Sequence, residues 1–197
     1  MIVFEPEDRM PPDISRTVFL KKTGSTVLLV TASGSILSLL HCGGTPLARN
    51  LRFSNLDEAI IEIDRVLKAS SVSSNGVWSP SQVFTHLAQS IEYSITGYPE
   101  NKPAIFRKTI GRIVLGRFLS AGQMSHGLGD AIPGAPELDA GVSPADAAAR
   151  LKAAIASFRS AQKGLAIHFV YDAVTQAEYE QVHAMHIANH LSAFTYS

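Results

Sequence analysis

The fold is decided by residues 79–97, which read SPSQVFTHLAQSIEYSITG. Ser79 and Gln82 have the spacing of a capping box, and Pro80 stands at the first helical position, where its missing N–H needs no partner. The apolar residues that follow recur at helical spacing and form one face; they are Val83, Phe84, Leu87, Ile91 and Ile95. The segment therefore predicts an amphipathic helix from Pro80 to near Gly97.

Three further segments carry similar helix-start signals. Asn55 is the expected N-cap of a helix over residues 56–68. Residues 143–146 (SPAD) begin an alanine-rich helix that is expected to end near residue 161. Residues 175–178 (TQAE) begin the last helix, which is expected to end near Phe194. Both of these starts are Ser/Thr-x-x-acid capping boxes, so the chain carries four predicted helices of bundle length.

A long connection, residues 99–141, separates the second and third of these helices. Residues 105–119 keep helical spacing, whereas residues 121–141 are rich in Gly and Pro and predict an irregular loop. A connection of this length allows the helices that it joins to run parallel. The pattern predicts an all-α fold: a four-helix bundle, within a domain over residues 51–197, with a long crossover connection between the second and third bundle helices.

The amino-acid composition excludes some classes of function and some kinds of metal site. Lys+Arg and Asp+Glu both number 17, so the chain lacks the basic excess that drives nucleic-acid binding, and we expect no nucleic-acid partner. The one cysteine, Cys42, excludes a disulfide within the chain and a cluster of thiolate ligands. Any metal site must therefore use imidazole or carboxylate groups. Of the seven histidines, His168, His183, His186 and His190 fall in the last thirty residues.

Residues 1–45 have the features of an export leader. Residues 27–40 form an apolar run that is short for a membrane span but normal for a signal peptide, and Lys21 and Lys22 precede it. Residues 15–22 (SRTVFLKK) resemble a twin-arginine signal in which Thr17 replaces the second arginine, and residues 39–43 (LLHCG) resemble a lipoprotein cleavage box. These features predict an exported protein, periplasmic or lipid-anchored. The alternative is a cytoplasmic protein whose N-terminal apolar helix packs on the domain.

The last predicted helix carries His183, His186 and His190 on its apolar side. His186 and His190 lie one turn and about 40° apart, so one metal ion can take both, or it can take His183 with His186, but not all three comfortably. Imidazoles that face a core need hydrogen-bond partners or a metal ion. The spacing thus leaves two ligand pairs and a purely hydrogen-bonded arrangement open.

His86 lies at the edge of the apolar face of the helix that begins at Pro80. If this helix neighbours the last one, His86 supplies a third nitrogen ligand to the pair on the last helix. Three nitrogen ligands with an open position make a catalytic type of metal site, in which a bound water or thiol is acidified.

Three segments resemble the DinB/YfiT-like superfamily, in an uncharacterised branch. They are residues 78–87 (WSPSQVFTHL), residues 183–194 (HAMHIANHLSAF), and the stretch from Arg117 to Pro136 that contains MSHGL and IPGAP. The resemblance covers residues 51–197. It implies a four-helix bundle with a crossover connection and one divalent metal ion, often zinc, nickel or iron, bound by His86 and by the pair His186 and His190.

The resemblance also implies a choice of activities. One is a metal-dependent transferase or hydrolase that activates water or a low-molecular-weight thiol against a small molecule, with His183 or His168 as candidate proton relays. The alternative is a non-catalytic metal-binding or structural helical bundle in the cell envelope. His126, His168 and His183 either orient the ligands through hydrogen bonds or are polar loop and core residues, and His126 is interpreted as the second of these. A dimer is compatible with the sequence, which does not fix the oligomeric state.

Overall fold

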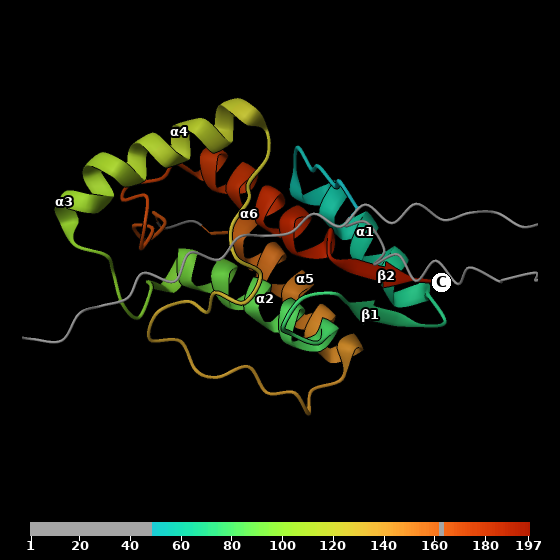
Figure 1. The fold of residues 1–197 in the computed structure, drawn as a ribbon. Coiled ribbons are helices and arrows are strands. Elements are labelled where there is room, and N and C mark those ends of the chain that lie inside the picture. The colour runs from blue at the N-terminus through green and yellow to red at the C-terminus, as the bar shows by residue number, and fades with distance from the viewer. Residues whose placement is uncertain (1–48, 162–163) are drawn as a thin grey trace, which may run out of the picture. The chain divides into compact units, whose positions relative to one another are not determined.

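The computed structural model describes residues 49–161 and 164–197. The predicted leader, with its twin-arginine and lipoprotein motifs, lies outside these residues. The described part of the chain is mostly helical and contains one small sheet (Figure 1). None of its helices is both long enough and apolar enough to cross a membrane.

Four long helices begin where the sequence predicts. They are α1 (Leu56–Lys68), α2 (Pro80–Thr96), α5 (Pro144–Arg159) and α6 (Gln176–Leu191). The Asn55 side chain accepts hydrogen bonds from the backbone N–H groups of Asp57 and Glu58, and Ser79 and Thr175 each form a complete capping box. Each such cap stabilises its helix by about 1 kcal/mol, which makes the start of a helix a local property of the sequence.

These helices pack pairwise around one main core. α2 contacts α5 and α6, and α1 contacts the same two helices. Figure 1 shows α2 and α5 running in the same direction, as the long connection between them allows. The core is filled by fully buried side chains from all four helices, among them Ile63, Phe84, Leu151, Phe158 and Ile187.

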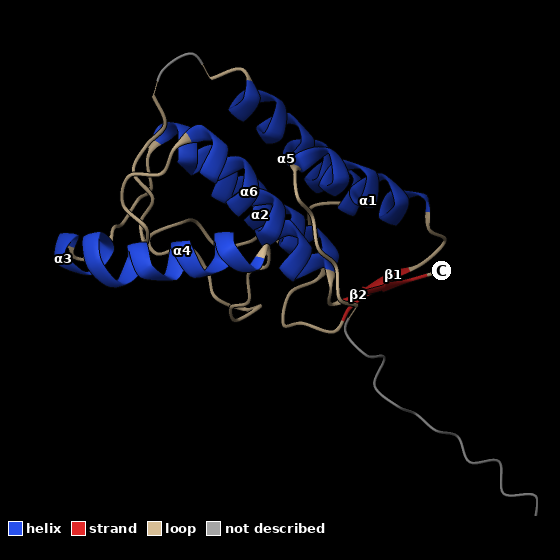
Figure 2. Ribbon diagram, turned by 90° about the horizontal axis from the view of Figure 1, so that it is seen from above, coloured by secondary structure: helices blue, strands red, loops and turns tan. Residues whose placement is uncertain are grey.

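The connection between α2 and α5 begins with α3 (Ala104–Phe106), the π-helical turn η1 (Arg107–Gly111) and α4 (Arg112–Ala121), in place of the single helix expected over residues 105–119. α4 packs against α6 (Figure 2), and a second apolar cluster fills their interface. At Gly111 an added Cβ would lie 1.9 Å from the carbonyl oxygen of Val170. Glycine at this position therefore allows η1 to touch the backbone of the loop that precedes α6.

A two-stranded antiparallel sheet corrects the all-α prediction. β1 (Val72–Ser74) pairs with β2 (Phe194–Tyr196), with Val72 opposite Tyr196 and Ser74 opposite Phe194. The predicted end of the last helix at Phe194 is therefore wrong, because α6 ends at Leu191. Phe194 is fully buried and packs edge-on against Phe84, with the ring centroids 5.6 Å apart. This tertiary contact favours an extended backbone at Phe194 over continuation of the helix. The sheet lies at the end of the domain opposite α3 (Figures 1 and 2).

Candidate functional site

Three histidines from two helices meet between α2 and α6. His86 comes from α2, and His186 and His190 come from α6. One ring nitrogen of each lies within 4.8 Å of the others. Nε2 of His86 is 3.3 Å from Nε2 of His186, and the His190 ring centroid is 4.9 Å from those of both other rings. Of the two ligand pairs that the spacing left open, the structure brings His186 and His190 to His86.

Burial keeps these imidazoles neutral. His86 is 2% exposed and His190 is 1% exposed, whereas His186 is half-buried. Burial lowers the pKa of His86 to about 4 and that of His190 to about 2, and it holds the pKa of His186 well below its ordinary value, in each case helped by the neighbouring histidines. A neutral imidazole has a free nitrogen lone pair, which is the form that binds a metal ion.

Several nitrogens of this group have no hydrogen-bond partner among the described residues. They are Nδ1 of His86 and both Nδ1 and Nε2 of His190. A neutral imidazole contains one N–H donor and one acceptor, so His190 leaves both functions unused inside the protein. Each unpartnered buried polar group destabilises the fold by about 1–3 kcal/mol, so this arrangement needs an explanation.

Trp78 covers one side of the three histidines. Its ring lies 4.7 Å from that of His86 and is nearly parallel to that of His190 at 6.0 Å. The residue directly precedes the capping box of α2, so the start of the helix places it there. Nothing in the local spacing of the sequence indicates that Trp78 packs on the histidines, so its position was not predicted.

His126 is a fourth imidazole beside this group. It comes from the irregular segment between α4 and α5, and its ring centroid lies 4.9 Å from that of His186 and 5.1 Å from that of His190. Its Nδ1 is 2.9 Å from the carbonyl oxygen of Gly127, so in the neutral ring Nδ1 donates and Nε2 keeps a lone pair. The interpretation of His126 as an ordinary loop residue missed this position, which depends on how the loop folds back.

Side chains of the two histidine-bearing helices hold that irregular segment in place. From α2, the Gln82 side chain donates to the carbonyl oxygen of Leu138 at 3.0 Å, and the Gln89 side chain donates to that of Pro136 at 3.4 Å. From α6, the Asn189 side chain donates to the carbonyl oxygen of His126 at 3.4 Å. The segment after α4 is therefore fastened over the site although it has no regular structure.

The two candidate relays, His183 and His168, lie outside the group of three. Nε2 of His183 is 3.1 Å from the Ser94 hydroxyl oxygen, and its ring stacks on Tyr179. His168 lies in the loop before α6. Burial lowers the pKa of each to about 3. Of these two, only His168 borders the cavity that reaches the histidine group.

That cavity has a volume of about 410 Å³ and lies beside the three histidines. His86, His126, His186 and His168 all line it, together with mostly apolar side chains. Its volume is in the range of small-molecule sites, which are typically about 300–1,000 Å³. A ligand in the cavity would therefore contact His86 and His186 directly.

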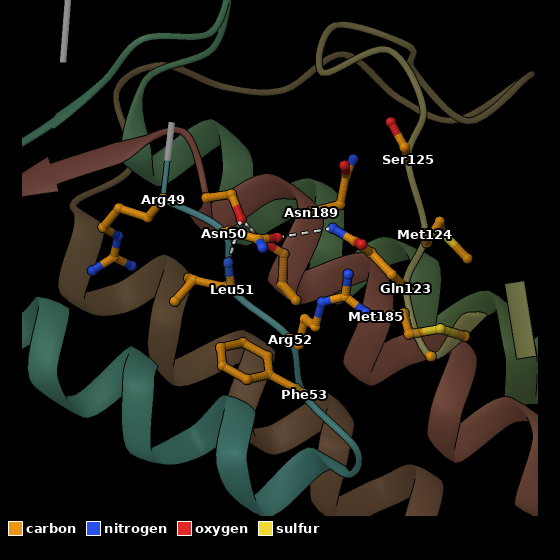
Figure 3. A pocket seen from close by; sticks show the side chains of 13 residues that line it. Arg49, Asn50, Leu51, Arg52, Phe53, Gln123, Met124, Ser125, Met185 and Asn189 are labelled. Carbon is orange, nitrogen blue, oxygen red and sulfur yellow. Dashed lines mark hydrogen bonds between the residues drawn. The ribbon is translucent and has the colours of Figure 1, made fainter. Parts of the chain in front are cut away.

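A second hollow, of about 230 Å³, lies between residues 49–53, the end of α4 and α6 (Figure 3). The described residues that line it include no histidine. The Gln123 side chain donates to the Asn50 side-chain oxygen across it at 3.1 Å, as the dashed line in Figure 3 shows. This contact anchors the start of the segment that carries His126.

Comparison with known proteins corrects the family resemblance. A family model described as "Protein of unknown function (DUF1569)" matches residues 47–197. No DinB/YfiT family model matches, so the resemblance to the DinB/YfiT-like superfamily was wrong. It rested partly on helical segments with histidines at turn spacing, a pattern that many helices with core-facing imidazoles share, and partly on short motifs in the connection after α4. No curated protein and no solved structure matches the chain.

Proposed function

Because the chain belongs to the DUF1569 family, whose function is unknown, we propose a function from the site itself: the domain binds one divalent transition-metal ion through His86, His186 and His190. Zinc, nickel and iron are the expected ions, since imidazole suits all three. The observation that carries this proposal is the environment of His190. Both of its ring nitrogens are buried without a hydrogen-bond partner, and its ring centroid lies 4.9 Å from those of the other two imidazoles.

The four long helices suit this role as a four-helix bundle. In the contacts between them, α1 adjoins α5 and α6, and α2 adjoins the same two, so the helices form a closed ring of neighbours. We propose that this ring is a bundle with a crossover connection, and that α2 and α6 carry the ligands toward each other across it. Metal sites in such bundles are built from side chains on facing helices.

The proposed activity is that of a metal-dependent transferase or hydrolase acting on a small molecule. A divalent ion held by three neutral nitrogens supplies Lewis-acid chemistry and acidifies a water or thiol at its open position. The chain's own groups fit this use: His86 and His186 border the cavity, Trp78 and His126 pack against the three rings, and His168 lies where it can hydrogen-bond to a ligand in the cavity.

Metal analysis of protein purified without a histidine tag tests the proposal. We expect roughly one zinc, nickel or iron ion per chain, as three nitrogen ligands imply. The variants His186→Ala and His190→Ala should lose the ion. His183→Gln is the matched control, since it removes an imidazole from the same helix but from outside the group, and it should keep the ion.

The outcomes separate three functions. Metal-free native protein whose thermal stability does not rise with added zinc or nickel would show that the histidines are only packed and hydrogen-bonded. Metal-loaded protein that turns over no combination of thiol and electrophile and no hydrolysable ester or amide would favour a non-catalytic metal-binding module. Turnover that disappears in His186→Ala but persists in His183→Gln supports the enzyme.

A further inference from the structure

The cavity beside the histidines is apolar along most of its length. Its apolar lining comes from α4, α6 and the irregular segments on either side, and includes Val114, Phe118, Met124, Ile132, Val170 and Val182. Such a lining favours a ligand with an apolar body, because burying apolar surface is worth about 25 cal/mol per Å². The polar groups of the cavity lie at particular places, and these decide which functional groups the ligand carries.

His168 presents a hydrogen-bond donor to the cavity. Its Nδ1 accepts hydrogen bonds from the backbone N–H groups of Val170 at 3.0 Å and Tyr171 at 3.3 Å. Backbone N–H groups only donate, so Nδ1 is the unprotonated nitrogen and Nε2 carries the proton of the neutral ring. Burial, which lowers the pKa of His168 to about 3, keeps the ring in this neutral form.

A tight turn fixes the direction of this donor. The backbone groups of His168 and Asp172 bond to each other in both directions, at 2.8 and 3.1 Å, and Asp172 adopts a left-handed conformation with φ of 64°. The His168 ring stacks on Tyr171 with centroids 4.3 Å apart. His168 is 6% exposed, and no hydrogen bond within the described residues uses its Nε2. Nε2 is not among the buried unpartnered atoms, so it remains accessible, and an acceptor atom on a ligand in the cavity can bond to it.

Charge is distributed unequally over the cavity. Lys102 also lines it, and the Lys102 backbone N–H donates to the carbonyl oxygen of Phe169 at 3.0 Å, which holds the Lys102 backbone beside the residue that follows His168. Asp130 lines the cavity near His126, whose pKa it helps to raise against the larger effect of burial. In the metal-free protein an anionic group is therefore favoured near Lys102 and disfavoured near Asp130, and the Asp172 carboxylate of the His168 turn is paired with Arg107 at 3.3 Å. A metal ion bound by the three histidines would attract the same group to the other end of the cavity.

We propose that the cavity binds a compact apolar carboxylate, whose carboxylate oxygen accepts the Nε2–H of His168 beside Lys102 and whose apolar body extends toward His86 and His186. Any reaction of this ligand rests on the proposed metal function, because the part of the ligand nearest His86 and His186 is the part that would meet the ion. The recognition itself uses residues outside the three ligands. It assigns His168 to substrate binding.

Calorimetric titration with 4-phenylbutyrate tests this inference, with 4-phenylbutanol as the uncharged probe of similar shape. The full chain is titrated once in EDTA and once with one equivalent of zinc. We expect the carboxylate to bind in both conditions and at least about tenfold more tightly than the alcohol, as a hydrogen bond to a charged group implies. Binding that appears with zinc and vanishes in EDTA would mean that the carboxylate coordinates the ion, which contradicts the assignment to His168.

Variants locate the binding. His168→Phe keeps a ring but removes the donor and should weaken carboxylate binding about tenfold or more. Val182→Phe should abolish it by filling the cavity. Lys102→Ala should weaken it, whereas Lys108→Ala, an exposed lysine that does not line the cavity, is the matched charge control and should not. Circular dichroism and thermal unfolding of each variant show that it is folded, independently of metal binding.

The two proposals fail in different ways. If the protein binds no metal ion but binds phenylbutyrate in a manner that depends on His168, the metal function is wrong and the carboxylate site stands. If it binds zinc but not phenylbutyrate, or if His168→Phe binds the carboxylate as well as the unaltered protein, the carboxylate site is wrong and the metal function stands.

Discussion

Nε2 of His86 lies 3.3 Å from Nε2 of His186, although 100 residues separate them in the sequence. Two nitrogens that each lie about 2.0–2.1 Å from one zinc ion at the tetrahedral angle are about 3.3–3.4 Å apart. A hydrogen bond between the two rings would also fit this distance, but it leaves His190 unexplained, with both nitrogens unpartnered. One ion shared by the three rings would account for this short distance and would take one nitrogen of each ring, including one of the two on His190.

Trp78 should report metal binding. It is the one tryptophan of the chain and contacts the rings of His86 and His190. Added Ni²⁺ should therefore quench most of the intrinsic fluorescence and saturate near one equivalent, because a paramagnetic ion would lie close to the indole. His168→Phe should be quenched like the unaltered protein. Quenching that never saturates, or that is unchanged in His190→Leu, would show that the ion binds elsewhere.

His190→Leu should separate stability from function. In EDTA the substitution replaces two unpartnered buried nitrogens by an apolar side chain of similar volume, so the free energy of unfolding should rise by about 1–3 kcal/mol. The same variant should lose its metal ion. Urea unfolding and metal analysis measure the two effects. A variant that is less stable in EDTA and still holds metal would falsify the role of His190 as a ligand.

The metal-free protein should lose stability in acid. His168 and His183 have pKa values near 3 in the folded protein because they are buried, whereas an unfolded histidine titrates near its ordinary value of about 6.5. Their contribution is complete above about pH 6.5. Between that pH and about 3 the unfolded chain binds protons that the folded chain does not bind. The free energy of unfolding therefore falls by about 1.4 kcal/mol for each imidazole per unit decrease in pH.

Urea unfolding in EDTA at several pH values between 7.5 and 4.5 measures this slope. His183→Gln removes one of the titrating rings and should make the slope shallower by the amount of one proton. Equal slopes for the variant and the unaltered protein would mean that His183 is not held neutral by burial.

Replacing either of two glycines in the same helical region by alanine should change the stability of the protein in opposite directions. In Gly111→Ala the new Cβ meets the carbonyl oxygen of Val170, so the loop that carries His168 must move and the protein should lose about 1–3 kcal/mol of stability. At Gly116, within α4, an added Cβ meets nothing within 4 Å, so Gly116→Ala should stabilise by about 0.5–1 kcal/mol. Thermal unfolding of both variants checks the contrast; similar losses in both would contradict the close approach at Gly111.

The sequence predicts the long helices well because their signals are local. Ser79 with Gln82 and Thr175 with Glu178 form the capping boxes that it indicates. The same logic placed His186 and His190 on one side of a helix. That they meet His86 could only be a conditional expectation, because it requires α2 and α6 to be neighbours and no local pattern fixes this.

What the sequence did not show depends on contacts between distant segments. β1 and β2 are three residues each, and their pairing joins segments more than a hundred residues apart. His126 reaches the site because Gln82, Gln89 and Asn189 fasten an irregular segment over it. The roles of Trp78 and His168 likewise follow from how loops pack, which has no periodic signal in the sequence.

X-ray absorption at the zinc edge, on protein loaded with one equivalent of zinc, tests most directly whether imidazoles from α2 and α6 hold a single ion. We expect nitrogen ligands at about 2.0–2.1 Å with the outer-shell scattering of three imidazole rings, reduced to two in His86→Ala. A spectrum without imidazole scattering, or one that His86→Ala leaves unchanged, would contradict the shared site.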